Sequence, residues 1–433
     1  MSQQTPTDSK NLDKAIIVLA QLKDESCNVS LLDELEELVN NCNIEVIEKF
    51  FVKILEPNAK FLIGSGKAAE IATKAKELGA SMIVFDNELS PSQQRNLERE
   101  FDICVIDRHE IILDIFSSRA QTKEACLQVE LARLEYSLPR LRRAWTHLNR
   151  QRGGGVTQRG EGESQLELDQ RQIREKIAKL KRELSVVRKN RETQRKKRLR
   201  VPFPTAAVVG YTNAGKSTLL NRLANANVLA QDLLFATLDP TTRMVKLPLG
   251  QSVLLTDTVG FVRNLPHQFV EAFKSTLEET LTSDFLIHIV DSSSPDVFEH
   301  IATTHNVLKE LGVSDKKTIL VFNKDDLAND DVLKHQLHRT YPYAITMSLK
   351  NCEGIDALLS SIESMLEREY KVVELLIPHS QYKLATSLHE IGAVRQSKHT
   401  DDGIIITAKI PIQLFEKYQN FLLKPNLSFN KTI

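Results

Sequence analysis

No stretch of the sequence approaches the roughly 18 consecutive apolar residues that a membrane-spanning helix requires. The polar start, MSQQTPTDSK, lacks the apolar core of a signal peptide. The five cysteines are scattered, with neither a CxxC pair nor a histidine partner at the spacing of a metal site. We therefore expect buried, reduced thiols without disulfides or zinc. These absences predict a cytoplasmic protein with no membrane anchor and a disordered tail over residues 1–11; peripheral contact with a membrane stays an alternative.

The chain as a whole also lacks net charge, since 57 Lys and Arg balance 57 Asp and Glu. This balance hides an asymmetry. From Arg133 to Arg200 there are 21 Lys and Arg against 8 Asp and Glu. A segment this basic favours a polyanionic partner such as a nucleic acid.

The chain is long enough for two to four domains, and its patterns change along its length. Strand-like and helical runs alternate over residues 12–116 and again over 203–370, which predicts parallel α/β sheets. Residues 117–200 have long helical patterns with one glycine-rich break. Residues 371–433 resemble a small module of two or three strands with a helix. The predicted fold class is α/β, with an N-terminal α/β domain, a helical linker, a nucleotide-binding domain and a small C-terminal α/β domain.

Apolar residues recur at spacings of three and four on both sides of the glycine-rich break, QRGGGVTQRGEGES. Such seams are typical of helices that pack along one another. Folded back at about residue 157, the two seams face each other: 148 lies opposite 166, 141 opposite 173, 134 opposite 180 and 127 opposite 187. The pattern predicts an antiparallel helical hairpin roughly 45 Å long. We expect a kink at Pro139.

Arginines surround the predicted tip of this hairpin. Arg150, Arg152 and Arg159 flank the glycine-rich break, and Arg140, Arg142 and Arg143 precede it. Glycines permit close backbone approach to a polyanion, and arginines bind phosphates. We therefore predict that Arg150, Arg152 and Arg159 bind RNA; the alternative is a passive turn between solvated helices.

The most specific motif is GYTNAGKST, at Gly210–Thr218, between the apolar run TAAVVG and a helical pattern. That order is what a phosphate-binding P-loop requires. Backbone N–H groups should surround the phosphates, Lys216 should reach the β and γ oxygens, and Ser217 should bind Mg²⁺. The candidate residues are Gly210, Tyr211, Thr212, Asn213, Ala214, Gly215, Lys216 and Ser217. GSGKAAE, at Gly64–Glu70, lacks the flanking residues of this motif, so we interpret it as a turn that starts a helix.

A second motif, LLTDTVGF, contains Asp257, Thr258, Val259 and Gly260 at the end of an apolar run. The Asp257 carboxylate is placed to hold Mg²⁺ through water, and the Gly260 N–H to contact the γ-phosphate. In many GTPases the next residue is a glutamine that orients the attacking water. Here it is Phe261, which can neither donate nor accept a hydrogen bond.

Two further motifs indicate the base. NKDD, comprising Asn323, Lys324, Asp325 and Asp326, follows the apolar run TILVF, and MSLK, with Ser348, Leu349 and Lys350, follows YAI. The Asp326 carboxylate can accept hydrogen bonds from the ring N–H and the exocyclic amine of guanine, which adenine lacks. A lone NKDD could be an acidic turn. Four motifs in this order predict a GTPase that binds GTP and GDP with Mg²⁺.

With these motifs the chain resembles the HflX family of GTPases from about Lys60 onward. Further matches are SPSQQRNLE (Ser90–Glu98), LQVELARLEYSLPRL (Leu127–Leu141), GEGESQLELDQRQIR (Gly160–Arg174) and LFATLDPTTR (Leu234–Arg243). The resemblance implies a Ras-like GTPase domain and binding to the large ribosomal subunit and its RNA, with subunit splitting or rescue of stalled ribosomes. It departs from the family at Ser164, where threonine is usual, and at Leu349, where alanine is common.

The resemblance also implies roles for the LFATLDPTTR motif. Thr237 should close on Mg²⁺ in the GTP state, and Phe235, Ala236, Leu238 and Asp239 should line the nucleotide. Lys216, Thr237 and Gly260 are then the expected catalytic residues. Phe261 implies slow hydrolysis until the ribosome orders these loops.

Several alternatives stay open from the sequence. Asn213 either binds K⁺, as in potassium-activated GTPases, or only stabilises the P-loop. We expect a monomer. The alternative functions are an RNA-remodelling factor that also uses ATP, and a nucleotide-dependent interaction protein in which hydrolysis is incidental.

Overall fold

The computed structural model of the chain forms two compact units. It describes residues 13–24, 30–141, 159–198, 203–224, 234–235, 237–248, 250–263, 279–367, 370–390 and 394–423. The first unit comprises Met1–Lys189, Gln231–Asp239 and Arg263–Ser275. The second unit comprises Asn190–Ala230, Pro240–Val262 and Thr276–Ile433.

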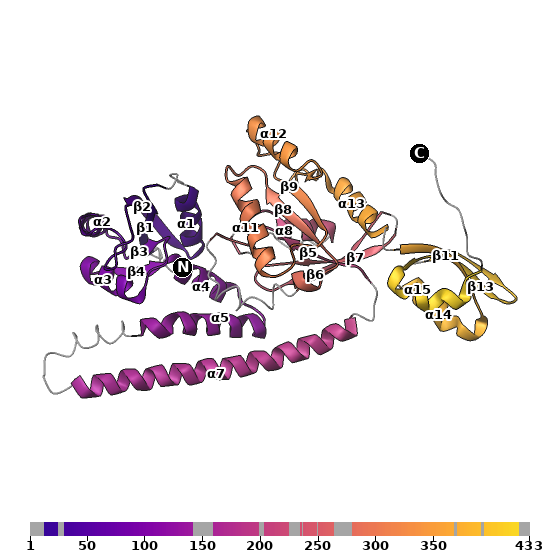
Figure 1. Cartoon of the computed structure of the whole chain (residues 1–433), viewed down its shortest axis with the longest axis horizontal. Coiled ribbons are helices and arrows are strands. Elements are labelled where there is room, and N and C mark those ends of the chain that lie inside the picture. Colours follow the sequence, from indigo (N-terminus) through magenta and orange to yellow (C-terminus); the bar gives the residue numbers. More distant parts are fainter. Residues whose placement is uncertain are drawn as a thin grey trace, which may run out of the picture. The chain divides into compact units, whose positions relative to one another are not determined.

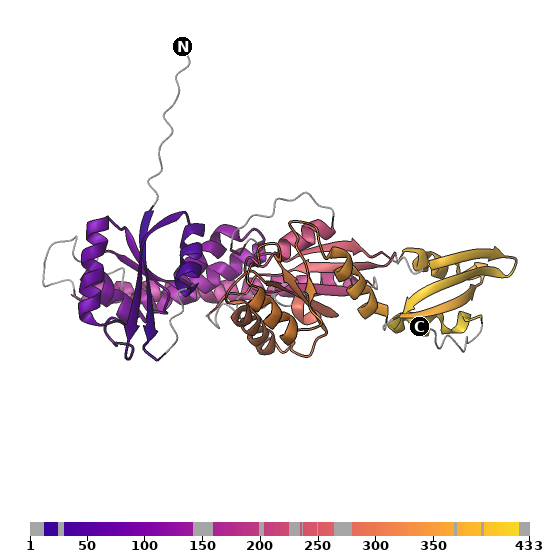
Figure 2. The same ribbon diagram turned by 90° about the horizontal axis from the view of Figure 1, so that it is seen from above.

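The first unit begins with a four-stranded parallel sheet in the order β2–β1–β3–β4. Its strands are β1 (Asp13–Leu22), β2 (Ile44–Ile54), β3 (Met82–Phe85) and β4 (Cys104–Asp107). The intervening helices are α1 (Ser30–Asn41), α2 (Ser65–Leu78), α3 (Pro91–Phe101) and α4 (Arg108–Arg119). Helices α2 and α3 pack on one face of the sheet, and α1 lies with α4 on the other (Figures 1 and 2). The predicted α/β alternation is confirmed, and GSGKAAE starts α2 after Gly64 as expected.

The predicted helical linker follows as α5 (Lys123–Ser137) and α7 (Arg159–Arg198), which lie side by side in Figure 1. Leu127 and Leu131 of α5 pack against Leu180 and Leu184 of α7, with Leu134, Ile177 and Val187 beside them. This is the antiparallel pairing that the leucine spacing predicts. Ion pairs at the edge of the seam join Lys176 to Glu130 at 2.6 Å and Lys181 to Glu135 at 2.8 Å.

The predicted kink takes the form of a helix end. At Pro139 the α-helix gives way to a short 3-10 turn, Leu138–Arg140, because proline cannot continue the α-helical hydrogen bonds. The predicted tip residues Arg150 and Arg152 lie outside the described residues, and Arg159 is the first residue of α7.

The second unit contains a six-stranded sheet in the order β10–β9–β8–β5–β7–β6, in which only β6 runs antiparallel to its neighbour. The strands are β5 (Thr205–Val209), β6 (Thr241–Lys246), β7 (Ser252–Asp257), β8 (Phe285–Asp291), β9 (Thr318–Asn323) and β10 (Ile345–Thr346). The helices are α8 (Lys216–Leu223), α11 (Val297–Glu310), α12 (Asp331–Thr340) and α13 (Ile355–Glu367). This is a P-loop GTPase domain, as the motifs predict.

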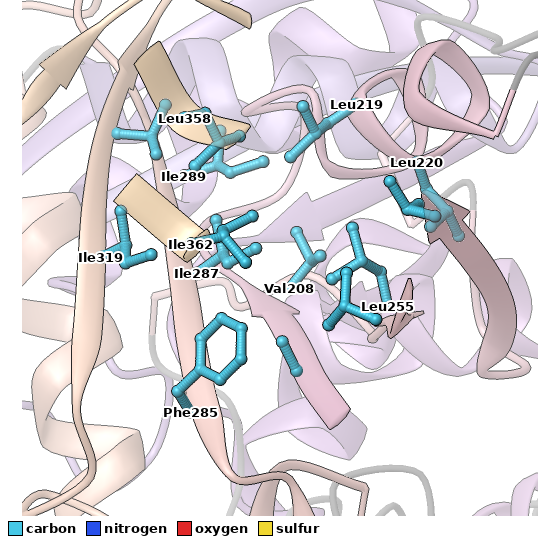
Figure 3. Close-up of a cluster of buried hydrophobic side chains, with 14 of the residues drawn as sticks. Val208, Leu219, Leu220, Leu255, Phe285, Ile287, Ile289, Ile319, Leu358 and Ile362 are labelled. Carbon is cyan, nitrogen blue, oxygen red and sulfur yellow. The ribbon is translucent and has the colours of Figure 1, made fainter. Parts of the chain in front are cut away.

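Alternating strand residues divide between the two faces of this sheet. Val208, Leu255, Phe285, Ile287 and Ile289 point to the face covered by α8 and α13, where Figure 3 shows them around Leu219, Leu358 and Ile362. On the other face, Ala207, Val209 and Leu286 pack with residues of α11. Burial on both faces fixes the strand positions, and the carboxyl ends of the parallel strands therefore present their loops at one edge.

A small C-terminal domain completes the second unit. It has an antiparallel sheet in the order β11–β13–β12, formed by β11 (Tyr370–Ile377), β12 (Val394–Thr400) and β13 (Gly403–Pro411). Helices α14 (Tyr382–Glu390) and α15 (Ile412–Tyr418) pack on this sheet. The core of the domain includes Leu375, Leu388, Ile406 and Tyr418. Two or three strands and a helix were expected, and the three strands and the final helix are present; α14 was not predicted.

The cysteine expectation is partly wrong. Cys42 is half-buried, and burial raises its pKa to about 11, but Cys104, Cys126 and Cys352 are exposed. None of these four cysteines forms a disulfide, and the described residues include no group of three or more His, Cys, Asp or Glu side chains that could hold a metal ion. Within the same residues, no helix is both long and apolar enough to cross a bilayer.

The hairpin seam can be tested with Leu184→Ala. Leu184 is 4% exposed, so its truncation should lower the free energy of unfolding by about 2–4 kcal/mol. The matched control is Val186→Ala on the same helix, where the side chain is 57% exposed and the loss should stay within about 0.5 kcal/mol. Urea unfolding followed by the fluorescence of the single tryptophan, Trp145, measures both variants. Equal losses would contradict the seam.

Candidate nucleotide-binding site

The P-loop connects β5 to α8, and its sharp turn depends on glycine at Gly215. That residue has φ of +100°, and a Cβ there would lie 2.3 Å from Nδ2 of Asn323. Asn323 fills this space: its Nδ2 donates to the Ala214 carbonyl at 2.9 Å, and its Oδ1 accepts from the Leu349 N–H at 3.2 Å. Asn323 therefore joins the phosphate loop to the loop that is expected to contact the base.

Lys216 is buried beside the start of the γ-phosphate loop. Its Nζ donates to the Tyr211 carbonyl at 2.6 Å, and a Cβ on Gly260 would lie only 2.9 Å from Nζ. Burial lowers the pKa of Lys216 to about 8, and the carboxylate of Asp257 opposes this shift. The motifs around Lys216 and Gly260, separated in sequence, thus meet at one point, where a cation can face phosphate oxygens.

Ser217 and Asp257 provide the oxygen ligands that Mg²⁺ prefers. The Ser217 hydroxyl, in the first turn of α8, donates to Asp257 Oδ2 at 2.6 Å, and Asp257 is 2% exposed at the end of β7. A hydroxyl and a carboxylate beside a phosphate-binding loop are a donor set that fits Mg²⁺. Between Asp257 and Gly260, Thr258 Oγ1 donates to the Val208 carbonyl at 2.8 Å, and Val259 is buried.

Phe261 is a packing residue. Its N–H donates to the Gly210 carbonyl at 3.1 Å, and its carbonyl accepts from the Thr212 N–H at 2.7 Å. Its ring is 2% exposed and lies in the cluster with Val209, Leu286 and residues of α11. The residue that replaces the water-orienting glutamine therefore joins the γ-phosphate loop to the P-loop through its backbone and anchors this loop in the core through its ring, a role that the sequence did not reveal.

The base-recognition residues separate into two groups. Asp326 accepts from the Ser348 hydroxyl at 2.7 Å, which brings the predicted guanine-reading residues NKDD and MSLK together. Asp325 instead pairs with Lys334 of α12 at 3.0 Å, and Lys324 pairs with Asp291 at 2.7 Å. Leu349 is buried and Lys350 is exposed. These pairs position Asp326 as the carboxylate available to a base.

Two of the predicted switch residues, Phe235 and Asp239, contact helices of the first unit. The Phe235 ring packs edge-on against Phe116 of α4, with ring centroids 4.7 Å apart. Asp239 hydrogen-bonds to residues at the start of α5. Thr237 is half-buried, Leu238 is buried, and Ala236 lies outside the described residues.

Two histidines near the P-loop were not singled out from the sequence. His300 of α11 stacks on the Tyr211 ring with centroids 3.9 Å apart, which holds the first turn of the P-loop. His288 of β8 is 1% exposed, and burial lowers its pKa to about 3, so it is neutral near pH 7. Neither residue lies in a motif, so only the tertiary structure associates them with the site.

Three family models match consecutive parts of the chain. They are described as GTP-binding GTPase N-terminal (residues 30–117), GTP-binding GTPase Middle Region (119–198) and 50S ribosome-binding GTPase (205–324). The chain is 50% identical to GTPase HflX of Akkermansia muciniphila over 409 residues, which cover 91% of this chain and 92% of that protein. It is 41% identical to GTPase HflX of Escherichia coli over 385 residues, covering 88% and 90%. A crystal structure of a GTP-binding protein from Sulfolobus solfataricus with GDP is 25% identical, with a TM-score of 0.44, and covers 82% of this chain and 99% of that one.

The contact between Asp326 and Ser348 gives a prediction about the base. Asp326→Asn replaces an acceptor with a donor and should shift the preference from GTP towards XTP by orders of magnitude. The matched control is Asp325→Asn, because that carboxylate pairs with Lys334 and its loss should leave the GTP preference unchanged. Competition between the two nucleotides in a binding assay measures the ratio. A wild-type ratio in Asp326→Asn would refute the role of Asp326.

The burial of Lys216 gives a pH dependence. Phosphate oxygens beside Nζ favour its charged form, so nucleotide binding should raise a pKa that starts at about 8. Well below pH 8 the lysine is charged with and without nucleotide, so GDP binding takes up no proton there. Above pH 8 binding should take up a proton, up to one per site. Calorimetry in two buffers of different ionisation enthalpy measures this uptake. In Lys216→Arg the side chain stays charged, so any uptake that persists would have to come from another group.

Proposed function

Because the chain belongs to the HflX family of GTPases, we propose that it binds the large ribosomal subunit and couples GTP binding and hydrolysis to ribosome splitting or to the rescue of stalled ribosomes. The chain is a GTPase with a GTPase domain of the ribosome-binding family. The observation that supports binding to the ribosome is the long helical hairpin. This element is basic, and nucleotide hydrolysis by itself does not require it.

The charge on the hairpin supports an RNA partner. The α7 helix carries 14 Lys and Arg against 7 Asp and Glu. Arg174, Lys179 and Arg182 are exposed on it, while the apolar seam faces α5. Cations on a solvent-facing helix bind phosphate groups and release condensed counterions. We propose that the Arg150, Arg152 and Arg159 region contacts ribosomal RNA, with the two helices as a stiff support.

The site residues suggest how hydrolysis proceeds. Lys216 binds the β and γ oxygens, the Gly260 N–H contacts the γ-phosphate, and Asp326 reads guanine. Ser217 and Thr237 would hold Mg²⁺, with Asp257 acting through water, and the ion would neutralise phosphate charge. Phe261 is buried and cannot orient water, so we propose that hydrolysis is slow until the ribosome orders the loops.

The remaining proposals follow from this partner. A ribosomal target implies action in the cytoplasm, and we propose that the chain acts as a monomer. Asn213 has φ of +59°, a left-handed conformation that asparagine tolerates better than most residues. This backbone requirement accounts for the asparagine without an ion; K⁺ binding there stays a prediction. The pairing of Asp326 with Ser348 supports guanine recognition over the ATP-driven alternative.

The tip proposal predicts a selective loss. Replacing Arg150, Arg152 and Arg159 with Glu should weaken binding to large subunits at least tenfold and flatten its salt dependence, because phosphate contacts become repulsions. Affinity for GDP should be unchanged, since none of the three belongs to a nucleotide motif. Co-sedimentation at two salt concentrations measures ribosome binding.

The matched control for this charge reversal lies in the C-terminal domain. Lys383, Arg395 and Lys398 are exposed there, so their replacement with Glu changes the net charge equally. This control should retain most of the ribosome binding. Unaltered binding and salt slope in the tip variant would mean that the tip is only a turn.

A further inference from the structure

Asp239 forms part of the start of helix α5, although it lies far from α5 in the sequence. Its carboxylate accepts hydrogen bonds from the N–H of Gln121 at 3.1 Å, the N–H of Thr122 at 3.0 Å and the hydroxyl of Thr122 at 2.5 Å. Thr122 is itself the N-cap of α5, because its Oγ1 accepts from the Ala125 N–H at 3.2 Å. Asp239 and Thr122 together satisfy donors that the first turn of a helix leaves unpaired.

A second contact, made by Phe235, holds the chain on the N-terminal side of Thr237, whereas Asp239 holds it on the C-terminal side. Phe235 is 2% exposed, and its ring meets Phe116 of α4 edge-on, with an interplanar angle of 78°. Leu234 and Leu238 are also buried. Thr237, the residue expected to close on Mg²⁺ in the GTP state, therefore lies between two anchors in the first unit.

Asp239 lies between Thr237 and the start of β6, where the backbone has little freedom. A movement of Thr237 should therefore displace the Asp239 carboxylate. Pro240 has a fixed φ and restricts the residue before it, and β6 begins at Thr241. Asp239 is two residues from Thr237, which limits their separation to about 7 Å along the chain. A displacement of Thr237 by several ångströms therefore strains the bonds between Asp239 and α5.

Helix α5 is also the first helix of the hairpin. Its leucines pack on Leu180 and Leu184 of α7, and Lys176 and Lys181 of α7 pair with its glutamates. The Asp239 bonds thus connect a nucleotide-dependent segment to the element proposed to bind RNA.

The second nucleotide-dependent loop has an anchor in the first unit as well. Arg263, two residues after Phe261, is 8% exposed and places Nε 3.8 Å from Glu34 Oε2 of α1. Glu34 also pairs with Arg108, which binds Asp86 at 2.6 Å. Both loops that respond to the γ-phosphate in GTPases therefore have charged contacts in the same unit.

We propose that Asp239 is a positioning residue: with Thr122 it forms a latch that holds the Thr237 segment at the start of α5, and closure of Thr237 on GTP or engagement of the hairpin by its partner opens this latch. The inference rests on the proposed roles of Thr237 and of the hairpin. Because coupling between two sites is reciprocal, whatever opens the latch from the hairpin side must also favour the GTP state.

Hydrogen exchange tests the latch in the full-length protein without ribosomes. Amides of Gln121 and Thr122 are bonded to Asp239, so exchange in a peptide spanning residues 118–126 should be faster with Mg²⁺ and a non-hydrolysable GTP analogue than with GDP. The peptide around Ser90, which caps α3 in the same unit, is the internal control and should not change. Equal exchange of the 118–126 peptide in both nucleotides would overturn the proposal.

Kinetics test the latch from the α5 side. Thr122→Ala removes the hydroxyl that both caps α5 and binds Asp239, so basal GTP hydrolysis should rise about fivefold, the factor that one cap is worth. Ser90→Ala removes a comparable cap from α3 and should leave the rate unchanged. An equal rate in the two variants, with equal losses of stability, would mean that Thr122 is only a helix cap.

A double-mutant cycle identifies the partner. Asp239→Ala should raise the basal rate as Thr122→Ala does, and the double variant should show little further increase, because both changes open one latch. Additive effects would overturn the pairing. The ratio of ribosome-stimulated to basal hydrolysis should fall by the same fivefold factor in Thr122→Ala. If ribosomes do not stimulate the wild-type protein, the proposed function fails, whereas the exchange and basal-rate results still decide the latch.

Discussion

The nucleotide site depends on the two hydrogen bonds that the side-chain amide of Asn323 makes to neighbouring loops. One amide group donates to the P-loop at Ala214 and accepts from the base-recognition loop at Leu349, and it fills the space that the missing Cβ of Gly215 leaves. Each of these loops follows a different strand of the parallel sheet, so strand order alone brings them only to the same edge. The buried amide sets their separation, because movement of either loop would leave one of its buried hydrogen-bonding groups without a partner.

The γ-phosphate loop is tied to the same framework by apolar packing. Phe261 forms a two-way backbone bridge with Gly210 and Thr212 while its ring enters the core beneath α11. A glutamine there would have to bury an amide among Val209 and Leu286 or leave this position, and burying an amide without partners is costly. Phenylalanine at this position thus packs the loop against the core and cannot orient the attacking water, which is why we propose that hydrolysis needs a partner.

The first unit also contains a few polar contacts that its apolar clusters do not provide. Its sheet and its hairpin have separate apolar clusters, one around Ile16 and Ile83 and one around Leu131 and Leu184. Within this unit, Asp239 and Arg263, which belong to the two loops expected to respond to the nucleotide, make charged contacts. Charged hydrogen bonds are strong but directional, so they can be exchanged for others, unlike a packed core. That property suits the proposed role of Asp239 as a contact that opens and closes.

The sequence by itself determined every feature that a local pattern encodes. The P-loop motif is nine consecutive residues that follow a strand and run into the first turn of a helix, and the α/β alternation follows from runs of apolar residues. The pairing of Leu127 and Leu131 with Leu180 and Leu184 followed from the spacing of leucines along one dimension. Thr122 and Asp239 are 117 residues apart, and Asn323 and Ala214 are 109 apart. No periodicity links such residues, because each pair meets only after strands and helices have packed. The same holds for Phe261, whose sequence position suggested catalysis and whose neighbours in the folded core made it an anchor.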